Sequence, residues 1–116
     1  MPETFSIPMQ FLEEHVGLLL EGKTTDLAQR YTEDATVVRF DRVANGRAEI
    51  KELFDDYAAE NPQITDLDGL RIHEDVILYQ AAEHLSDRTC TAVGTMVFRG
   101  SLIWRQTVTF VEHRPS

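Results

Sequence analysis

The chain has 116 residues, of which 42% are apolar, so it is long enough and apolar enough to form one domain, residues 1–116, around a buried core. Acidic side chains outnumber basic ones by 20 to 11, which gives a net charge of −9. Nucleic acids and anionic membrane surfaces attract clustered lysine and arginine, so this balance argues against both as partners. One cysteine, Cys90, allows no internal disulfide, and the N-terminus lacks a signal-peptide pattern. We therefore expect a cytoplasmic protein.

The N-terminal half is predicted to be mainly helical. Apolar residues recur at helical spacing in the first segment, which Gly22 can end. A short second helix follows, with Thr24 as its expected N-cap. Asn61-Pro62 ends the third helix. The expected elements are helices over 6–22, 25–31 and 47–60 and one strand over 35–41, with a loop before the third helix.

The C-terminal half is predicted to be β-structure. Valine, isoleucine, threonine and aromatic residues dominate three long segments, 70–85, 88–99 and 101–113. Ser86-Asp87 and Arg99-Gly100-Ser101 separate them. Helices followed by antiparallel strands indicate an α+β fold, in which a curved sheet wraps around the helices.

Alternation along the last strand predicts which side chains face the core. Every second residue from Leu102 to Phe110 is apolar except Gln106, so this face should be buried, with an amide in its middle. A buried amide needs partners, and two readings stay open: Gln106 bonds to Thr95 or backbone, or it contacts a ligand. If the turn at Gly100 has two residues, the core face consists of Leu102, Trp104, Gln106, Val108 and Phe110, with Val93, Thr95 and Val97 beside them.

The opposite face of these strands is then predicted to be an interaction surface. It is too apolar for a solvated sheet face and too polar for a second core. We expect a homodimer through this outer face, with coverage by the chain's own terminal residues as the alternative. The surface would comprise Met96, Phe98, Ile103 and Val111, interleaved with Cys90, Arg105, Thr107 and Thr109.

Two motifs, YTEDATVV at 31–38 and NGRAEIKELF at 45–54, together with the order of elements, resemble the nuclear transport factor 2-like (NTF2-like) superfamily. This group includes SnoaL-like polyketide cyclases and ketosteroid isomerases. The resemblance spans residues 5–113 and implies a cone-shaped, curved antiparallel sheet that wraps around three helices and encloses a pocket. Many members have a further strand after the position of His113, and its absence would leave an unpaired edge.

The isomerase site can be compared position by position. The resemblance places Arg39 at the general-base aspartate, His15 at the oxyanion-binding tyrosine and Gln106 at the protonated aspartate. An arginine cannot accept a substrate proton, so isomerisation by the usual base is excluded.

Two of these positions have competing interpretations. His15 lies at the edge of an apolar helix stripe, either as a core histidine with one satisfied nitrogen or as a pocket acid or base. Alternation alone places Val38 and Phe40 on the core face and leaves Arg39 exposed, whereas the resemblance points Arg39 inward with Asp41 as its carboxylate partner.

We therefore expect a SnoaL-like protein that binds a small, apolar, oxygenated metabolite and catalyses its cyclisation, isomerisation, dehydration or epoxide opening without a cofactor. The alternative is a non-catalytic binding or dimerisation domain of the same fold. The four histidines are scattered, so no metal site is expected. The candidate catalytic residues are His15, Arg39 and Asp41, and the candidate ligand-binding residues are Gln106, Trp104, Tyr31, Tyr57 and Thr95.

Overall fold

The computed structural model describes residues 9–86 and 88–113, apart from the side chains of 65–69. Within these residues the chain forms three helices and six strands. In chain order they are α1 (Met9–Leu20), α2 (Thr24–Ala28), β1 (Tyr31–Val38), β2 (Val43–Asn45), α3 (Gly46–Ala58), β3 (Gln63–His73), β4 (Val76–His84), β5 (Thr89–Arg99) and β6 (Leu102–Glu112).

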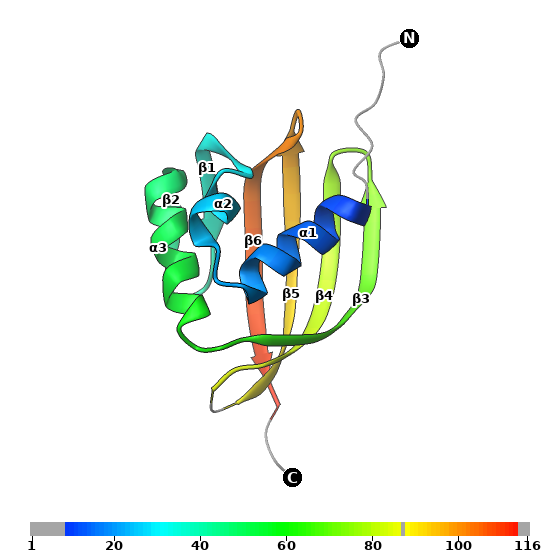
Figure 1. Ribbon diagram of the computed structural model, residues 1–116. Coiled ribbons are helices and arrows are strands. Elements are labelled where there is room, and N and C mark those ends of the chain that lie inside the picture. The colour runs from blue at the N-terminus through cyan, green and yellow to red at the C-terminus, as the bar shows by residue number, and fades with distance from the viewer. Residues whose placement is uncertain (1–8, 87, 114–116) are drawn as a thin grey trace.

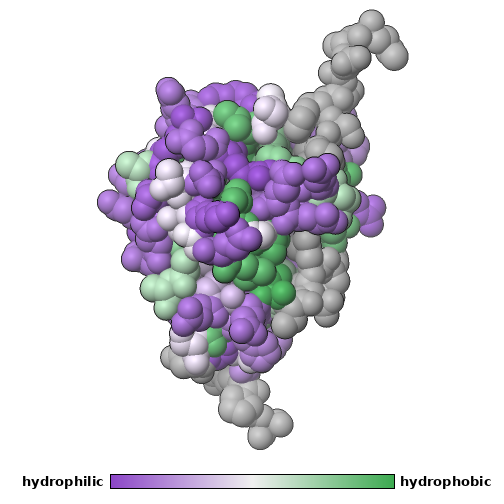
Figure 2. All heavy atoms as spheres, in the orientation of Figure 1, coloured by the Kyte–Doolittle hydropathy of each residue, from purple (hydrophilic) through white to green (hydrophobic). Residues whose placement is uncertain are grey.

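The strands form one curved sheet in the order β2-β1-β6-β5-β4-β3. Neighbouring strands are antiparallel except for β1 and β6, which run parallel. The helices lie against one face of this sheet (Figure 1), so the predicted α+β arrangement is confirmed. The space-filling view of this side is mainly polar, with a small apolar patch near its middle (Figure 2).

The last strand, β6, is not the unpaired sheet edge that the resemblance implied. β6 pairs with β1 on one side and with β5 on the other, so it lies inside the sheet. The edges are β2 and β3. The prediction counted too few strands, because the segment 70–85, expected to be one strand, contains a hairpin. His73 pairs with Val76, and Glu74 adopts a left-handed φ of 52° in the turn between β3 and β4.

Other boundaries also differ from the predictions. β1 begins at Tyr31 rather than at residue 35, and the expected loop before α3 contains β2. Thr24 belongs to α2 instead of capping it, and its hydroxyl donates to the carboxylate of Asp55 on α3. The start expected for the first helix, residues 6–8, lies outside the described residues.

A bulge in β6 changes which side chains face inward. Arg99 pairs with Leu102, so the turn at Gly100 has two residues, which is the condition on which the predicted faces depended. The register then shifts, because Phe98 pairs with Ile103 while Val97 pairs with Arg105. Trp104 is the extra residue. A one-residue shift moves side chains to the opposite face, so Ile103 and Gln106 both point to the core.

The residues predicted for the dimer surface are therefore wrong in part, and dimerisation itself stays a prediction. Met96, Phe98, Ile103 and Cys90 are buried in the core, whereas Thr107 and Val111 are exposed. The outward positions of β5 hold Val93, Thr95 and Val97 instead, because these residues alternate with the buried ones along the strand.

Candidate functional site

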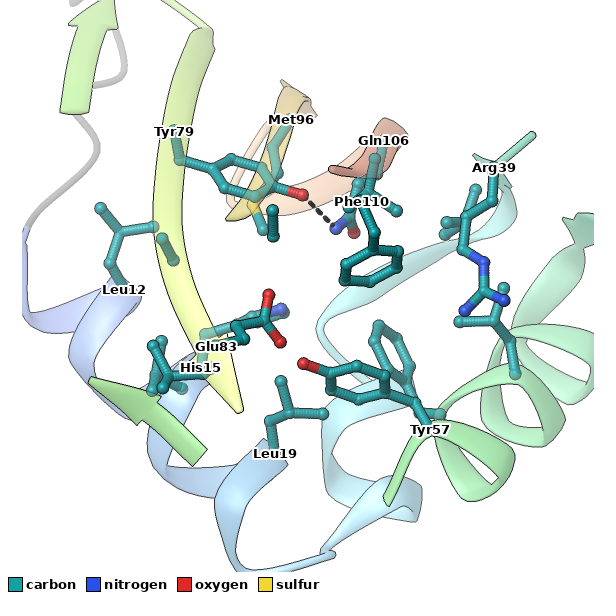
Figure 3. A pocket seen from close by; sticks show the side chains of 18 residues that line it. Leu12, His15, Leu19, Arg39, Tyr57, Tyr79, Glu83, Met96, Gln106 and Phe110 are labelled. Atoms are coloured by element: carbon teal, nitrogen blue, oxygen red, sulfur yellow. Dashed lines mark hydrogen bonds between the residues drawn. The ribbon is translucent and has the colours of Figure 1, made fainter. Parts of the chain in front are cut away.

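A cavity of about 100 Å³ lies between α1, α3 and the inner face of the sheet (Figure 3). Its walls are largely apolar. The helices contribute Leu12, Val16, Leu19, Leu53, Phe54 and Tyr57, and the strands contribute Val37, Ile64, Ala81, Ala92, Met96, Val108 and Phe110. The polar or charged members of the lining are His15, Arg39, Tyr79, Glu83 and Gln106.

Small residues on two neighbouring strands leave room for this cavity. Ala81 on β4 pairs with Ala92 on β5, and both face inward. Tyr79 pairs with Gly94. A side chain at Gly94 would overlap the Tyr79 hydroxyl and the Thr107 carbonyl oxygen. The glycine therefore lets the ring of Tyr79 cross the sheet toward Gln106.

Gln106 is held by two tyrosines. The hydroxyl of Tyr31 donates to Oε1 of Gln106, and Nε2 of Gln106 donates to the hydroxyl of Tyr79 over 3.0 Å. Tyr79 in turn donates to the Thr107 carbonyl oxygen over 3.4 Å. Burial raises the pKa of Tyr79 to about 12 and that of Tyr31 well above its usual value, so both keep their protons. We call Tyr31, Gln106 and Tyr79 the amide chain.

Glu83 is the cavity residue that sequence reasoning missed. Its side chain is 3% exposed on the inner face of β4, and its Oε1 has no hydrogen-bond partner among the described residues. The carboxyl group points into the cavity, as does the hydroxyl of Tyr57 (Figure 3). Burial raises the pKa of Glu83 from 4.5 to about 7.

The alternation of residues along β4 could have identified Glu83 from the sequence. Ile77, Ala81, Glu83 and Leu85 are buried at alternate positions, so Glu83 is the charged member of an inward face. Because 70–85 was read as a single strand, this alternation was not used.

His15 lies in the cavity wall on α1 and is buried. Its ring packs against Phe11 and Tyr31, with 5.9 Å between ring centroids in both cases. Nδ1 of His15 has no partner within the described part of the chain, but the core-histidine interpretation requires only one satisfied nitrogen, so it stands beside the pocket interpretation. Burial, and then the positive charge of Arg30, lower the pKa of His15 to about 3, so the ring is neutral near pH 7.

Arg39 also lines the cavity, as the resemblance implied, while Phe40 points outward and is 94% exposed. The guanidinium binds Asp41 through two hydrogen bonds, from Nε over 2.9 Å and from Nη2 over 2.7 Å. Hydrogen bonding from Arg39 lowers the pKa of Asp41. The Asp41 side chain is 66% exposed and lies outside the cavity, so its predicted place in the pocket is wrong.

The remaining predicted contacts divide between two faces of the sheet. Tyr57 lines the cavity, with its ring stacked on Phe110. Trp104 and Thr95 do not line it, because the bulge puts both on the outer face. The ring of Trp104 lies under the guanidinium of Arg105, 4.0 Å from its centroid, and Thr95 bonds to Thr107 over 2.7 Å. Tyr31 belongs to the core and reaches the site only through Gln106.

Two kinds of feature are absent from the described residues. Over 9–86 and 88–113, no three histidine, cysteine or acidic side chains gather as a metal site would require. No helix in these ranges is long and apolar enough to span a membrane.

The chain was compared with known proteins. No family model and no curated protein matches it. Solved structures do. A protein from Sphaerobacter thermophilus is 13% identical with a TM-score of 0.78, over 94% of this chain and 98% of that one. An NTF2-like protein of unknown function from Cytophaga hutchinsonii is 12% identical with a TM-score of 0.75, over 93% and 94%.

A third structure is of an enzyme. The epoxide hydrolase/cyclase-like enzyme SalBIII, which has a role in pyran ring formation in the polyether salinomycin, is 18% identical with a TM-score of 0.75, over 88% of both chains. At such identities the likeness concerns the fold. This chain therefore has the NTF2-like fold, on which enzymes and proteins of unknown function both occur.

Proposed function

We propose that the protein binds a small, largely apolar, oxygenated molecule in the cavity between α1, α3 and the sheet. The observation that carries this proposal is the carboxyl group of Glu83, buried at 3% exposure and pointing into an otherwise apolar space. Binding sites for small molecules are mostly apolar and contain a few polar groups that orient the ligand. Glu83 and the hydroxyl of Tyr57 are groups of this kind.

The charges around the cavity favour an uncharged ligand. The guanidinium of Arg39 is occupied by Asp41, and a pKa of about 3 keeps His15 neutral. With a pKa raised to about 7 by burial, Glu83 is partly protonated at neutral pH. A protonated carboxyl group can donate to a ligand oxygen, and an ionised one can accept from a hydroxyl.

On this proposal any reaction is cofactor-independent and works by acid–base chemistry, which covers the isomerisation, dehydration, cyclisation and epoxide opening considered above. The related epoxide hydrolase/cyclase-like enzyme supports this class of substrate. Binding without catalysis is the alternative, because the position of the usual isomerase base holds Arg39. The two differ in whether a bound molecule is converted.

The test is to fill the cavity. Ala92 faces the cavity and Val93, its neighbour in the chain, faces outward, so Ala92→Leu and Val93→Leu form a matched pair. Small ketones and epoxides are titrated against both variants by ligand-observed NMR, with circular dichroism as the check on folding. We expect about tenfold weaker binding, or none, for Ala92→Leu and unchanged binding for Val93→Leu. Equal affinities in the two folded variants would contradict binding in this cavity.

A further inference from the structure

Glu83 differs in its surroundings from Gln106, another buried polar residue of the sheet that lines the cavity. Gln106 is equally enclosed, at 6% exposure, but both of its terminal atoms have tyrosine partners. A buried polar group that serves the fold is normally hydrogen-bonded, because leaving it without a partner costs free energy. Oε1 of Glu83 has no partner among the described residues, and the carboxyl group points into the cavity (Figure 3), where a bound molecule can hydrogen-bond to it.

The residues around the carboxyl group leave it without a compensating cation in the described lining. The basic side chain that lines the same cavity, Arg39, holds Asp41 with two hydrogen bonds. His15 on α1 is buried without a charge. Burial is therefore what controls the ionisation of Glu83, and a carboxylate formed there is poorly solvated and strongly basic for its type.

From this geometry we propose that Glu83 is the catalytic proton-transfer residue of the cavity, which takes a proton from a bound oxygenated substrate and returns it to the substrate or to water. The inference rests on the proposed function, since it requires a ligand in the cavity. It assigns the reacting carboxyl group to β4, whereas the base position implied by the resemblance lies after β1 and holds Arg39. The acid–base group therefore lies on a different wall of the cavity.

The other titratable groups near Glu83 come from four elements. Cys90 on β5 is its directly paired neighbour, Tyr57 reaches the cavity from α3, His15 from α1, and Tyr79 lies two inward positions away on β4. Burial, followed by the negative charge of Glu83, raises the pKa of Cys90. The shifts of His15 and Tyr79, to about 3 and about 12, lie far from neutrality. A rate that changes near pH 7 is therefore attributed to Glu83.

A probe with one acidic C–H bond tests the step without knowledge of the natural substrate. In 5-nitrobenzisoxazole, a small, uncharged, oxygenated aromatic, a base removes the proton on the ring carbon next to nitrogen. The C–H electron pair forms the nitrile, the N–O bond breaks, and the oxygen leaves as a coloured phenolate. The Glu83 carboxylate would accept the proton and release it to water. A desolvated carboxylate beside apolar walls favours this reaction.

The experiment measures this elimination with the wild-type protein, Glu83→Gln, Glu83→Asp and the matched exposed control Glu52→Gln. We expect wild type and Glu52→Gln to convert the probe at equal rates, which rise with pH to a plateau around a midpoint near 7. Glu83→Gln should bind the probe with similar affinity but convert it about 100-fold more slowly or not at all. Glu83→Asp keeps the carboxyl group and should retain an intermediate rate with the same form of pH profile.

The outcomes separate the two proposals. Probe binding to the wild type without conversion, or conversion that Glu83→Gln leaves unchanged, overturns the role of Glu83 and leaves binding in the cavity standing. Failure of the wild type to bind this probe and the ketones and epoxides alike overturns the proposed function, and the role of Glu83 with it. Loss of conversion and of binding together in a folded Glu83→Gln shows that Glu83 only binds, and also contradicts the proton-transfer role.

Discussion

The amide chain on one side, and Glu83 and His15 on the other, are two sets of buried polar groups in and beside one cavity, and they differ in whether they have hydrogen-bond partners. Each member of the amide chain has a hydrogen-bond partner. Glu83 and His15 each keep one atom without a partner among the described residues. The hydrogen bonds of the amide chain satisfy its buried groups, whereas the buried atoms of Glu83 and His15 that lack partners lower the free energy of unfolding. Unsatisfied groups in a cavity are therefore better candidates for function than satisfied ones.

Burial shifts the pKa values of Glu83 and His15 in opposite directions. It favours the neutral form of both, so it lowers the pKa of His15 from 6.5 to about 3 and raises the pKa of Glu83 from 4.5 to about 7. As pH falls from 6.5 toward 3, the unfolded chain protonates His15 while the folded chain does not, and stability is lost. As pH rises from 4.5 toward 7, the unfolded chain ionises Glu83 first, and stability is lost again.

The largest loss of stability is expected from removing the side-chain amide of Gln106. Gln106→Leu leaves the hydroxyl of Tyr31 without its acceptor and that of Tyr79 without its amide donor in a buried site. We expect a loss of roughly 2–4 kcal/mol in the free energy of unfolding. Gln80→Leu, an exposed position on β4, is the matched control and should change little. Urea unfolding measures both, and equal stability of the two variants would show that the amide chain contributes nothing.

An effect of opposite sign is expected on the other side of the comparison. Glu83→Gln removes an ionisable group whose pKa is raised by folding, so it should stabilise the protein by roughly 3 kcal/mol at pH 8, where the wild-type carboxyl group is ionised. At pH 4 the carboxyl group is protonated in the folded state and largely so in the unfolded state, and the gain should vanish. Urea unfolding at the two pH values, with Glu52→Gln as control, checks this. A gain that is the same at both pH values would have another cause than ionisation.

The sequence was informative where its patterns were regular. The helical spacing of Ile50, Leu53, Phe54 and Tyr57 predicted α3 because these side chains are buried on one side of it. The hairpin at Glu74 was missed because its turn has no glycine, and the left-handed residue is a glutamate. The bulge at Trp104 changed the faces of β6 without a sequence signal, since a bulge depends on the pairing of two strands.

Part of the site was also predictable from the sequence, where spacing or the family resemblance located a residue. His15, Arg39 and Tyr57 were found because helical spacing and the family resemblance located them, and all three line the cavity. Alternation alone would have placed Arg39 in solvent, because Val38 and Phe40 are apolar although both are exposed. Thr95 and Trp104 were misplaced by the bulge, and Asp41 by its pairing with Arg39 outside the cavity. Glu83 was overlooked because a single glutamate in a long β-segment resembles a surface residue.

The central claim is that Glu83 lies desolvated in a cavity and exchanges its proton near neutral pH. The most direct test follows the side-chain carboxyl carbon of Glu83 by NMR as a function of pH, with Glu83→Gln to assign the resonance. The account predicts a midpoint near 7, well above the ordinary value of 4.5. A midpoint near 4.5 would mean that the carboxyl group is solvated or paired, and would contradict the account.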